Sequence, residues 1–225
     1  MRMMICNPWL FWNWFIKHHE KYKYPSKLTS KERLHWDKLL QREVYTLCFE
    51  HLFAEVICDE PASKARMIIS AHGNPKKFEK LELCMEAAPH IEGWEFQAFY
   101  PPMPAEAGTR HNYPSVTTMP DEIWFSPVEL IPDSGRYNIE LYVHENVPVS
   151  WEIQGAATQM MFNLLGEKIG GLYVRKVSVS HLTEVARNIQ QTLLPMTKLP
   201  EYIKPDDRLG MSIDPQGGFI KPGGK

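Results

Sequence analysis

Apolar and polar positions form their clearest pattern between residues 66 and 102, where they predict a strand, a sharp turn, an amphipathic helix and a second strand. Residues 66–71 are a short β-compatible run. Residues 73–75, Gly-Asn-Pro, supply a turn, a helix cap and a first helical position. Apolar residues at helical spacing follow, and residues 94–98 alternate as in a strand with one buried face.

The second half of the chain shows the same order of elements. Residues 122–130 indicate a strand, although Pro127 places it at an edge or a bulge. Residues 137–143 alternate between apolar and polar side chains. An amphipathic helix capped by Ser150 and a strand over residues 174–179 complete the series.

These elements predict two strand–strand–helix–strand pseudo-repeats, over residues 52–104 and residues 121–182. In the first, residues 52–58 and 66–71 are expected to form a hairpin. The two halves share little residue identity, so the pseudo-repeat is inferred from element order alone. We expect an α+β fold in which helices gather on one face of a mainly antiparallel sheet.

Residues 1–51 predict two helices added in front of this sheet. The first begins at Asn7, which caps it, and at Pro8, which suits the first helical position. The second begins at a capping box, in which Thr29 and Glu32 satisfy each other's free amides.

The first of these helices is crowded with aromatic residues. Trp9, Trp12, Phe15 and Ile16 share one face, and Trp14 lies at its margin. Trp12 and Trp14 cannot both point inward on a simple helix, so one is expected to be exposed or covered by the tail. Both are candidate binding residues, because large aromatic side chains are enriched at protein interfaces.

The elements together predict a single α+β domain over residues 1–194. Prolines and glycines are frequent from residue 195 to residue 225, and the apolar residues there are scattered. This Pro/Gly-rich C-terminal tail is expected to be either flexible or anchored by its apolar side chains. A long loop, residues 105–120, joins the two pseudo-repeats.

Composition narrows the partners and the compartment. A formal charge of −2 and an isoelectric point near 6.5 give no basic footprint for nucleic acid. The apolar N-terminal run is too short to span a membrane and lacks a small-residue cleavage site, so we expect a cytoplasmic protein without a membrane partner. The four cysteines form no Cys-x-x-Cys pair, and we expect reduced thiols.

Histidines at two strand ends supply the candidate enzyme chemistry. His72 lies directly before a helix N-terminus, where free amides attract anions. His144 and Glu145 occupy the corresponding place in the second pseudo-repeat. If both strand ends lie on one rim of the sheet, these three residues form a cleft suited to general acid–base work or to a metal. They are the candidate catalytic residues, although most such turns only connect a strand to a helix.

Other polar residues carry weaker signals. Arg110, His111 and Tyr113 occupy the long loop and are candidate binding residues, because loops often carry function. Residues 18–20, His-His-Glu, point in different directions on a helix and cannot chelate together. No nucleophile elbow or phosphate loop is present, so we expect no metal and no cofactor.

A set of short motifs resembles a group of uncharacterised bacterial hypothetical proteins that contain a domain of unknown function. The motifs are Ile68-Ile69-Ser70-Ala71, Gly73-Asn74, Phe78, Ala88-Pro89, Gly93-Trp94-Glu95-Phe96 and Ala98-Phe99. The resemblance covers the middle of the chain best. It implies an α+β domain of bacterial origin, and it supplies no activity and no catalytic residue.

Two functions remain open from the sequence. The first is a non-enzymatic cytoplasmic protein that binds another protein or itself, for example an immunity or inhibitor protein or an accessory domain. It is favoured by the aromatic N-terminal helix and by the absence of a catalytic signature. The alternative is a small hydrolase or ligand-binding enzyme that uses His72, His144 and Glu145 at a sheet rim.

Overall fold

The chain folds into two compact units, residues 1–100 and residues 101–225. The structure is a computed structural model that describes residues 7–59, 64–104, 112–126, 130–131, 135–185, 192–204, 206, 212–213 and 219–220. Both units combine helices with a sheet, so the predicted α+β class is confirmed. The division between the units falls close to the end of the first pseudo-repeat, and the single domain expected over residues 1–194 stays a prediction.

Unit 1 begins with the predicted helices. They are α1 (Pro8–His18), α2 (Glu20–Lys23), the short turn η1 (Pro25–Lys27), α3 (Ser30–Glu43) and the π-helical turn η2 (Val44–Cys48). Asn7 caps α1 by accepting the Trp9 N–H at 3.0 Å. The capping box of α3 is also confirmed, and its hydrogen bonds to Thr29 lower the pKa of Glu32.

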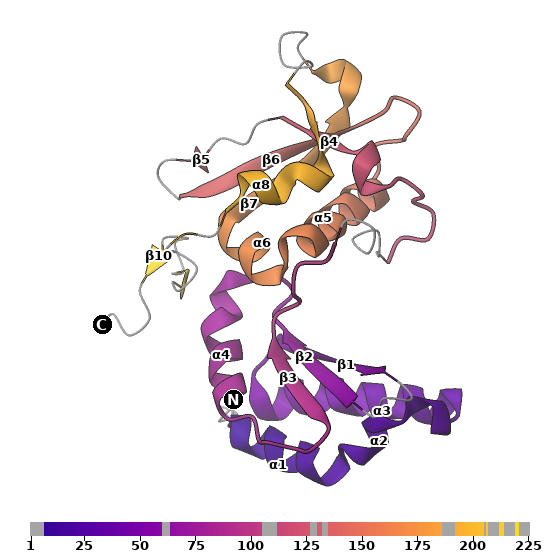
Figure 1. Cartoon of the computed structure of the whole chain (residues 1–225), viewed down its shortest axis with the longest axis vertical. Coiled ribbons are helices and arrows are strands. Elements are labelled where there is room, and N and C mark those ends of the chain that lie inside the picture. Colours follow the sequence, from indigo (N-terminus) through magenta and orange to yellow (C-terminus); the bar gives the residue numbers. More distant parts are fainter. Residues whose placement is uncertain are drawn as a thin grey trace, which may run out of the picture. The chain divides into compact units, whose positions relative to one another are not determined.

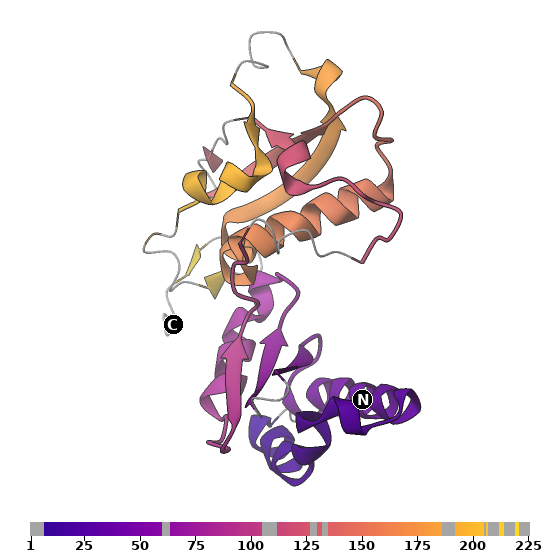
Figure 2. The same cartoon turned by 45° about the vertical axis from the view of Figure 1, so that its right-hand side comes forward.

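The sheet of unit 1 has three strands in the order β1-β2-β3. The remaining elements of this unit are β1 (Phe53–Asp59), β2 (Lys64–Ser70), η3 (Pro75–Lys77), α4 (Phe78–Glu86) and β3 (Trp94–Ala98). The predicted hairpin is confirmed, because β1 and β2 pair antiparallel. β3 instead pairs parallel to β2, since the connection through α4 returns the chain in its original direction. Figures 1 and 2 show α1, α2 and α3 gathered against one side of this sheet.

Trp12 joins three elements of the unit 1 core. Its side chain is 1% exposed, and its indole Nε1–H donates to the Cys84 carbonyl of α4 at 2.7 Å. Its ring also lies 4.8 Å from the ring of Phe96 on β3. Phe15, one turn later, packs edge-on against Trp94 of the same strand. One face of the sheet is thus covered by α1 and α4 together.

The cysteines of unit 1 correct one expectation. Cys48, at the end of η2, and Cys84, in α4, are both buried and form a disulfide across a Cα–Cα distance of 6.5 Å. They were expected to be reduced thiols, because 36 residues separate them and no local pattern indicates the pairing. Tertiary packing of η2 against α4 brings them together. Cys58 lies on β1, and its Sγ donates to the Tyr22 carbonyl at 3.0 Å.

Unit 2 also combines helices with a mixed sheet. Its elements are η4 (Pro120–Glu122), β4 (Trp124–Phe125), β5 (Leu130–Ile131), β6 (Arg136–Val143), α5 (Trp151–Leu165), α6 (Glu167–Tyr173), β7 (Val174–His181), η5 (Leu182–Glu184), β8 (Leu194–Pro195), η6 (Met196–Lys198), α8 (Leu199–Tyr202), β9 (Ser212–Ile213) and β10 (Phe219–Ile220). Ser150 caps α5 as predicted, by accepting the Ile153 N–H. α5 and α6 pack along β7, as Figure 2 shows for the long helix α5.

The five-stranded sheet of unit 2 is mixed. β4 pairs antiparallel with β6 and with β8, β5 pairs antiparallel with β6, and β6 pairs parallel with β7. The expectation of one mainly antiparallel sheet is therefore corrected to separate mixed sheets in the two units. Each contains a strand–helix–strand crossover, which makes its two strands parallel.

Part of the expected C-terminal tail belongs to unit 2. β8 and α8 lie within residues 195–225 or at their border, and the side chains of Met196, Leu199 and Ile203 are buried. The tail is thus ordered by its apolar side chains over residues 195–204. Within the described part of the chain, no helix is long and apolar enough to cross a bilayer.

A charged side chain lies at each end of α6. Glu167, 3% exposed, is the first residue of α6, where the helix dipole favours a carboxylate. Arg136 reaches the other end and donates to the carbonyl groups of Gly171, Leu172 and Val174 at 2.6–3.0 Å. Burial lowers the pKa of Arg136, but a guanidinium remains charged, so it can neutralise the negative end of α6.

On one edge strand of each unit, a glutamine from a helix bonds two of the outward backbone groups. Gln154 of α5 donates to the Val177 carbonyl and accepts the Val179 N–H of β7, both at 3.0 Å. Gln41 of α3 makes the same pair of contacts with the carbonyl and the N–H of a single β1 residue, Ala54. In both cases the side-chain amide takes the place of a neighbouring strand.

We predict that the double substitution Cys48→Ala and Cys84→Ala lowers the free energy of unfolding of unit 1 by about 2–5 kcal/mol, because the disulfide restricts the unfolded chain. Urea unfolding followed by tryptophan fluorescence measures the change. Reduction of the wild-type protein should give a similar loss, whereas Cys58→Ala should not. Equal midpoints before and after reduction would contradict the pairing.

We predict that Gly166→Ala lowers the free energy of unfolding of unit 2 by about 1–3 kcal/mol or more. This is the usual cost of one strained backbone conformation. Gly166 lies between α5 and α6 with φ +75° and ψ 155°, a conformation that an L-residue with a side chain rarely adopts. An added Cβ would also lie 2.8 Å from the backbone nitrogen of Pro102. The midpoint of thermal unfolding checks this, and an unchanged midpoint would refute it.

Candidate binding surface on the N-terminal helices

The outward side of α1 carries three exposed apolar side chains. Trp9 is 63% exposed, Leu10 is 50% exposed and Ile16 is 44% exposed. Trp9 and Ile16 are seven residues apart and so lie on the same side of the helix, with Asn13 between them. We call Trp9, Leu10, Asn13 and Ile16 the α1 face. An exposed apolar group of this kind on one helix is typical of an interaction surface.

Charge distinguishes the N-terminal helices from the rest of the chain. The first 48 residues contain nine Lys and Arg and four Asp and Glu, a net charge of +5, whereas the whole chain carries −2. Lys17 and Lys21 are exposed directly beyond the apolar part of the α1 face. The surface therefore combines apolar contacts with a positive border, a pattern that attracts partners carrying acidic groups.

The predicted binding residue Trp12 lies on the opposite side of α1. It is buried in the core described above, so its assignment to a surface is wrong. The sequence pattern grouped it with Trp9 and Ile16. In the structure the buried side is rotated toward Phe11, which is fully buried, and this rotation turns Trp9 and Ile16 outward.

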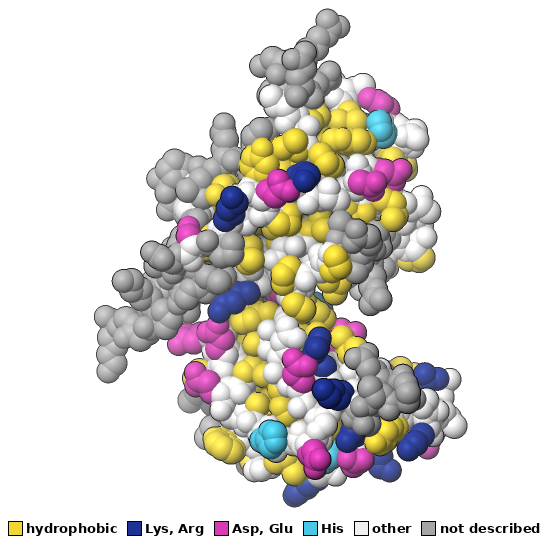
Figure 3. All heavy atoms as spheres, viewed as in Figure 1, with side chains coloured by type: hydrophobic (Ala, Val, Ile, Leu, Met, Phe, Trp, Pro, Cys, Tyr) yellow, Lys and Arg dark blue, Asp and Glu magenta, His cyan; other side chains and the backbone are white. Residues whose placement is uncertain are grey.

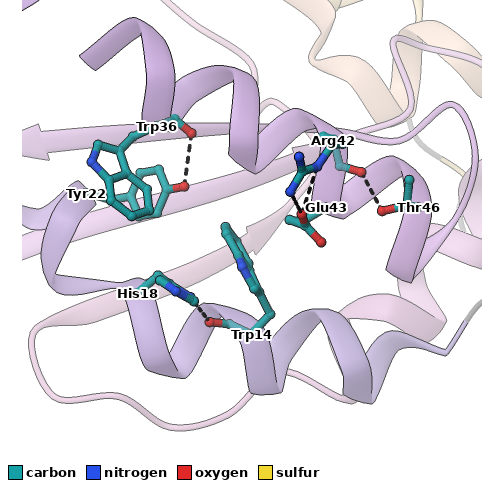
Figure 4. A network of polar contacts seen from close by, with 7 residues as sticks. All are labelled: Trp14, His18, Tyr22, Trp36, Arg42, Glu43 and Thr46. Atoms are coloured by element: carbon teal, nitrogen blue, oxygen red, sulfur yellow. Dashed lines mark hydrogen bonds and ion pairs between the residues drawn. The ribbon is translucent and has the colours of Figure 1, made fainter. Parts of the chain in front are cut away.

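The second predicted residue, Trp14, lies in a seam between α1, α2 and α3 (Figure 4). Its ring stacks on His18 at 4.9 Å and approaches Tyr22 at 6.4 Å. His18 donates from Nδ1 to the Trp14 carbonyl at 2.7 Å, and the Tyr22 hydroxyl donates to the Trp36 carbonyl at 3.0 Å. The half-buried Trp14 therefore holds the helices together. Only part of its surface is available to a partner.

The candidate catalytic histidines lie on two different sheets. His72 follows β2 in unit 1, with φ +50° and its ring 3.9 Å from Phe53. His144 follows β6 in unit 2, and its ring packs 4.8 Å from Trp124. Glu145 is exposed in the turn after β6. The predicted cleft of His72, His144 and Glu145 required both histidines to follow strands of the same sheet. They follow strands of different sheets.

Of the three candidate binding residues in the long loop, only Tyr113 lies within the described residues. Arg110 and His111 lie outside the described residues. The ring of Tyr113 lies against α5, where an added Cβ on Gly155 would fall 2.3 Å from the phenol oxygen, and it packs 5.8 Å from Trp151. Tyr113 therefore has a packing role that explains why α5 contains a glycine in its interior.

The open sheet face of unit 1 carries both apolar and charged side chains, unlike the apolar α1 face. The sheet face of unit 1 that α1 and α4 leave open carries Phe53 and Ile57 beside Glu55, Arg66 and Glu95. Apolar and charged side chains alternate over these strands in Figure 3. Arg66 and Glu95 form an ion pair at 3.0 Å across that face. Within the described residues, no group of three or more potential ligands could hold a metal ion.

Comparisons with known proteins supply no function for this chain. No family model, no curated protein and no solved structure matches the chain. The resemblance to uncharacterised bacterial proteins stays a prediction. The sequence reasoning overlooked Trp9 and Ile16 as surface residues. A signal for them existed, because α1 contains more large apolar side chains than one buried face can hold.

We predict that Tyr22→Phe lowers the free energy of unfolding by about 0.5–1.5 kcal/mol at neutral pH, because the Trp36 carbonyl loses its donor. Burial raises the pKa of the Tyr22 phenol, with further contributions from Asp37 and Glu43. Because the pKa of this phenol is higher in the folded than in the unfolded protein, the phenol stabilises the fold below the unfolded-state pKa of about 10. This stabilisation is lost as the pH rises further.

The difference between the wild type and Tyr22→Phe should therefore narrow above a pH of about 10. Urea unfolding across the alkaline range measures it. Tyr45→Phe, which changes a ring that is 42% exposed, is the matched control. A difference that stays constant or widens with pH would contradict the role of the buried phenol.

Proposed function

We propose that this protein is a non-enzymatic protein-binding module that recognises its partner through the α1 face. The exposure of Trp9, Leu10 and Ile16 on a single 11-residue helix carries this proposal. Tryptophan is enriched among the residues that dominate binding energy, and an exposed one costs little to bury in a partner's pocket. α1 is held from behind by the Trp12 contacts, so it presents this face without further folding.

The partner is expected to offer an apolar groove with an acidic border. An amphipathic helix that lies in such a groove is a common mode of protein recognition. Lys17 and Lys21 would meet the acidic border, and they would speed association by electrostatic steering. The same charges disfavour direct pairing of two α1 faces, so another protein is a better partner than a second copy. An immunity or inhibitor protein is one concrete form.

The alternative of a small hydrolase has less support. Its three proposed residues, His72, His144 and Glu145, belong to two sheets in two units, and each histidine packs against an aromatic ring. No single sheet therefore brings these three residues to one rim.

We predict that the triple substitution Trp9→Ser, Leu10→Ser and Ile16→Ser weakens partner binding by at least about 100-fold, or about 2.7 kcal/mol. Tagged full-length protein first identifies the partner in a native pull-down, and calorimetry with the purified partner then measures affinity. Binding should also weaken as salt increases.

The control is a chain with Leu34→Ser and Trp151→Ser, which removes two equally exposed side chains from other surfaces. It should bind within about threefold of the wild type, since its substitutions leave the recognition residues intact. Equal loss in both variants, unchanged binding in the α1 variant, or recovery of only self-associated protein would each contradict the proposal.

A further inference from the structure

A hollow of about 450 Å³ opens beside the end of α1, separate from the exposed apolar residues. Three segments of unit 1 contribute to it: the α1–α2 junction, the start of β2 and the turn before β3. Its lining residues are His19, Glu20, Lys23, Lys64, Ile91, Glu92 and Gly93. This volume lies in the lower part of the range of about 300–1,000 Å³ that is usual for small-molecule sites.

The hollow is lined by equal numbers of positive and negative side chains, and these do not form ion pairs with one another. Lys23 and Lys64 supply two ammonium groups, and Glu20 and Glu92 supply two carboxylates. Among the described residues, neither lysine forms an ion pair with either glutamate. A ligand can therefore meet both kinds of charge. A multiply charged anion such as a nucleotide would face repulsion from the two carboxylates.

Two buried nitrogen atoms, one on a lining residue and one on the residue that follows the lining residue Gly93, lack hydrogen-bond partners among the described residues. They are His19 Nδ1 and Trp94 Nε1. The His19 and Trp94 rings lie 6.2 Å apart at an angle of 88°, and Trp94 directly follows Gly93 of the lining. An indole N–H can only donate, and leaving it buried without an acceptor costs about 1–3 kcal/mol. His19 Nδ1 lies 3.4 Å from a Glu20 oxygen, which is an ionic contact only when His19 is protonated.

We propose that this hollow binds a small zwitterion of the α-amino acid class. Its carboxylate is held by Lys23 and Lys64 and supplies the acceptor that the Trp94 indole lacks. Its ammonium is held by Glu20 and Glu92. Ile91 is the apolar lining residue against which an aliphatic side chain would pack. The inference concerns a small molecule and does not depend on the protein partner of the α1 face.

The test uses the full chain labelled with ¹⁵N, whose indole signals are followed by NMR during titration with each of the common amino acids. The Trp94 signal is assigned through Trp94→Phe. We expect it to shift and saturate with at least one amino acid at a Kd of about 1 mM or below. Acetate and ethylammonium, which carry one charge each, should bind at least about tenfold more weakly.

Variants of the hollow separate a zwitterion site from a simple anion site. Lys64→Gln should weaken amino-acid binding by about tenfold or more. Glu92→Gln should also weaken it, while strengthening acetate binding, because the hollow then carries a net positive charge. Lys80→Gln, a lysine outside the lining that packs over Phe49, is the control.

Three results would overturn the proposal. In the first, no amino acid shifts the Trp94 signal at about ten times the expected Kd. In the second, acetate binds as tightly as the amino acids, which indicates an anion site. In the third, Lys64→Gln binds as well as the wild type, which places binding elsewhere. Because no macromolecular partner is present, each result leaves the α1 proposal untouched.

Discussion

The hydrogen bond from the buried Trp12 indole to the Cys84 carbonyl fixes the arrangement of unit 1. An indole N–H that is out of reach of water needs an acceptor, so the ring can lie in few positions. This bond and the contact with Phe96 together set the rotation of α1 about its own axis. The outward direction of Trp9 and Ile16 follows from that rotation. The exposed apolar surface is therefore a geometric consequence of the core.

The features that sequence predicts well are those determined by a few neighbouring residues. Asn7 and Ser150 cap helices, and Thr29 and Glu32 form a capping box, as their local patterns indicate. Each of these depends on backbone amides within one turn of the residue concerned. Strands with one buried face were equally recognisable. None of this information specifies which strands meet or in which direction.

The errors all concern contacts between distant segments. The Cys48–Cys84 disulfide and the parallel pairing of β3 with β2 depend on how α4 packs. The rotation of α1 depends on Phe96, more than 80 residues away. The hollow beside α1 combines Lys23, Lys64 and Glu92, which have no pattern in common along the chain. Such sites become visible only when the helices and strands are assembled.

The glutamine contacts at β1 and β7 limit how this protein can recognise others. Many proteins capture an extended peptide by adding it as a new strand to an exposed sheet edge. At Ala54, and at Val177 and Val179, the outward backbone groups are already bonded to Gln41 and Gln154. An incoming strand would have to displace a side chain anchored on a helix, with no net gain in hydrogen bonds. At these positions of β1 and β7, both strand addition and edge-to-edge aggregation are therefore disfavoured.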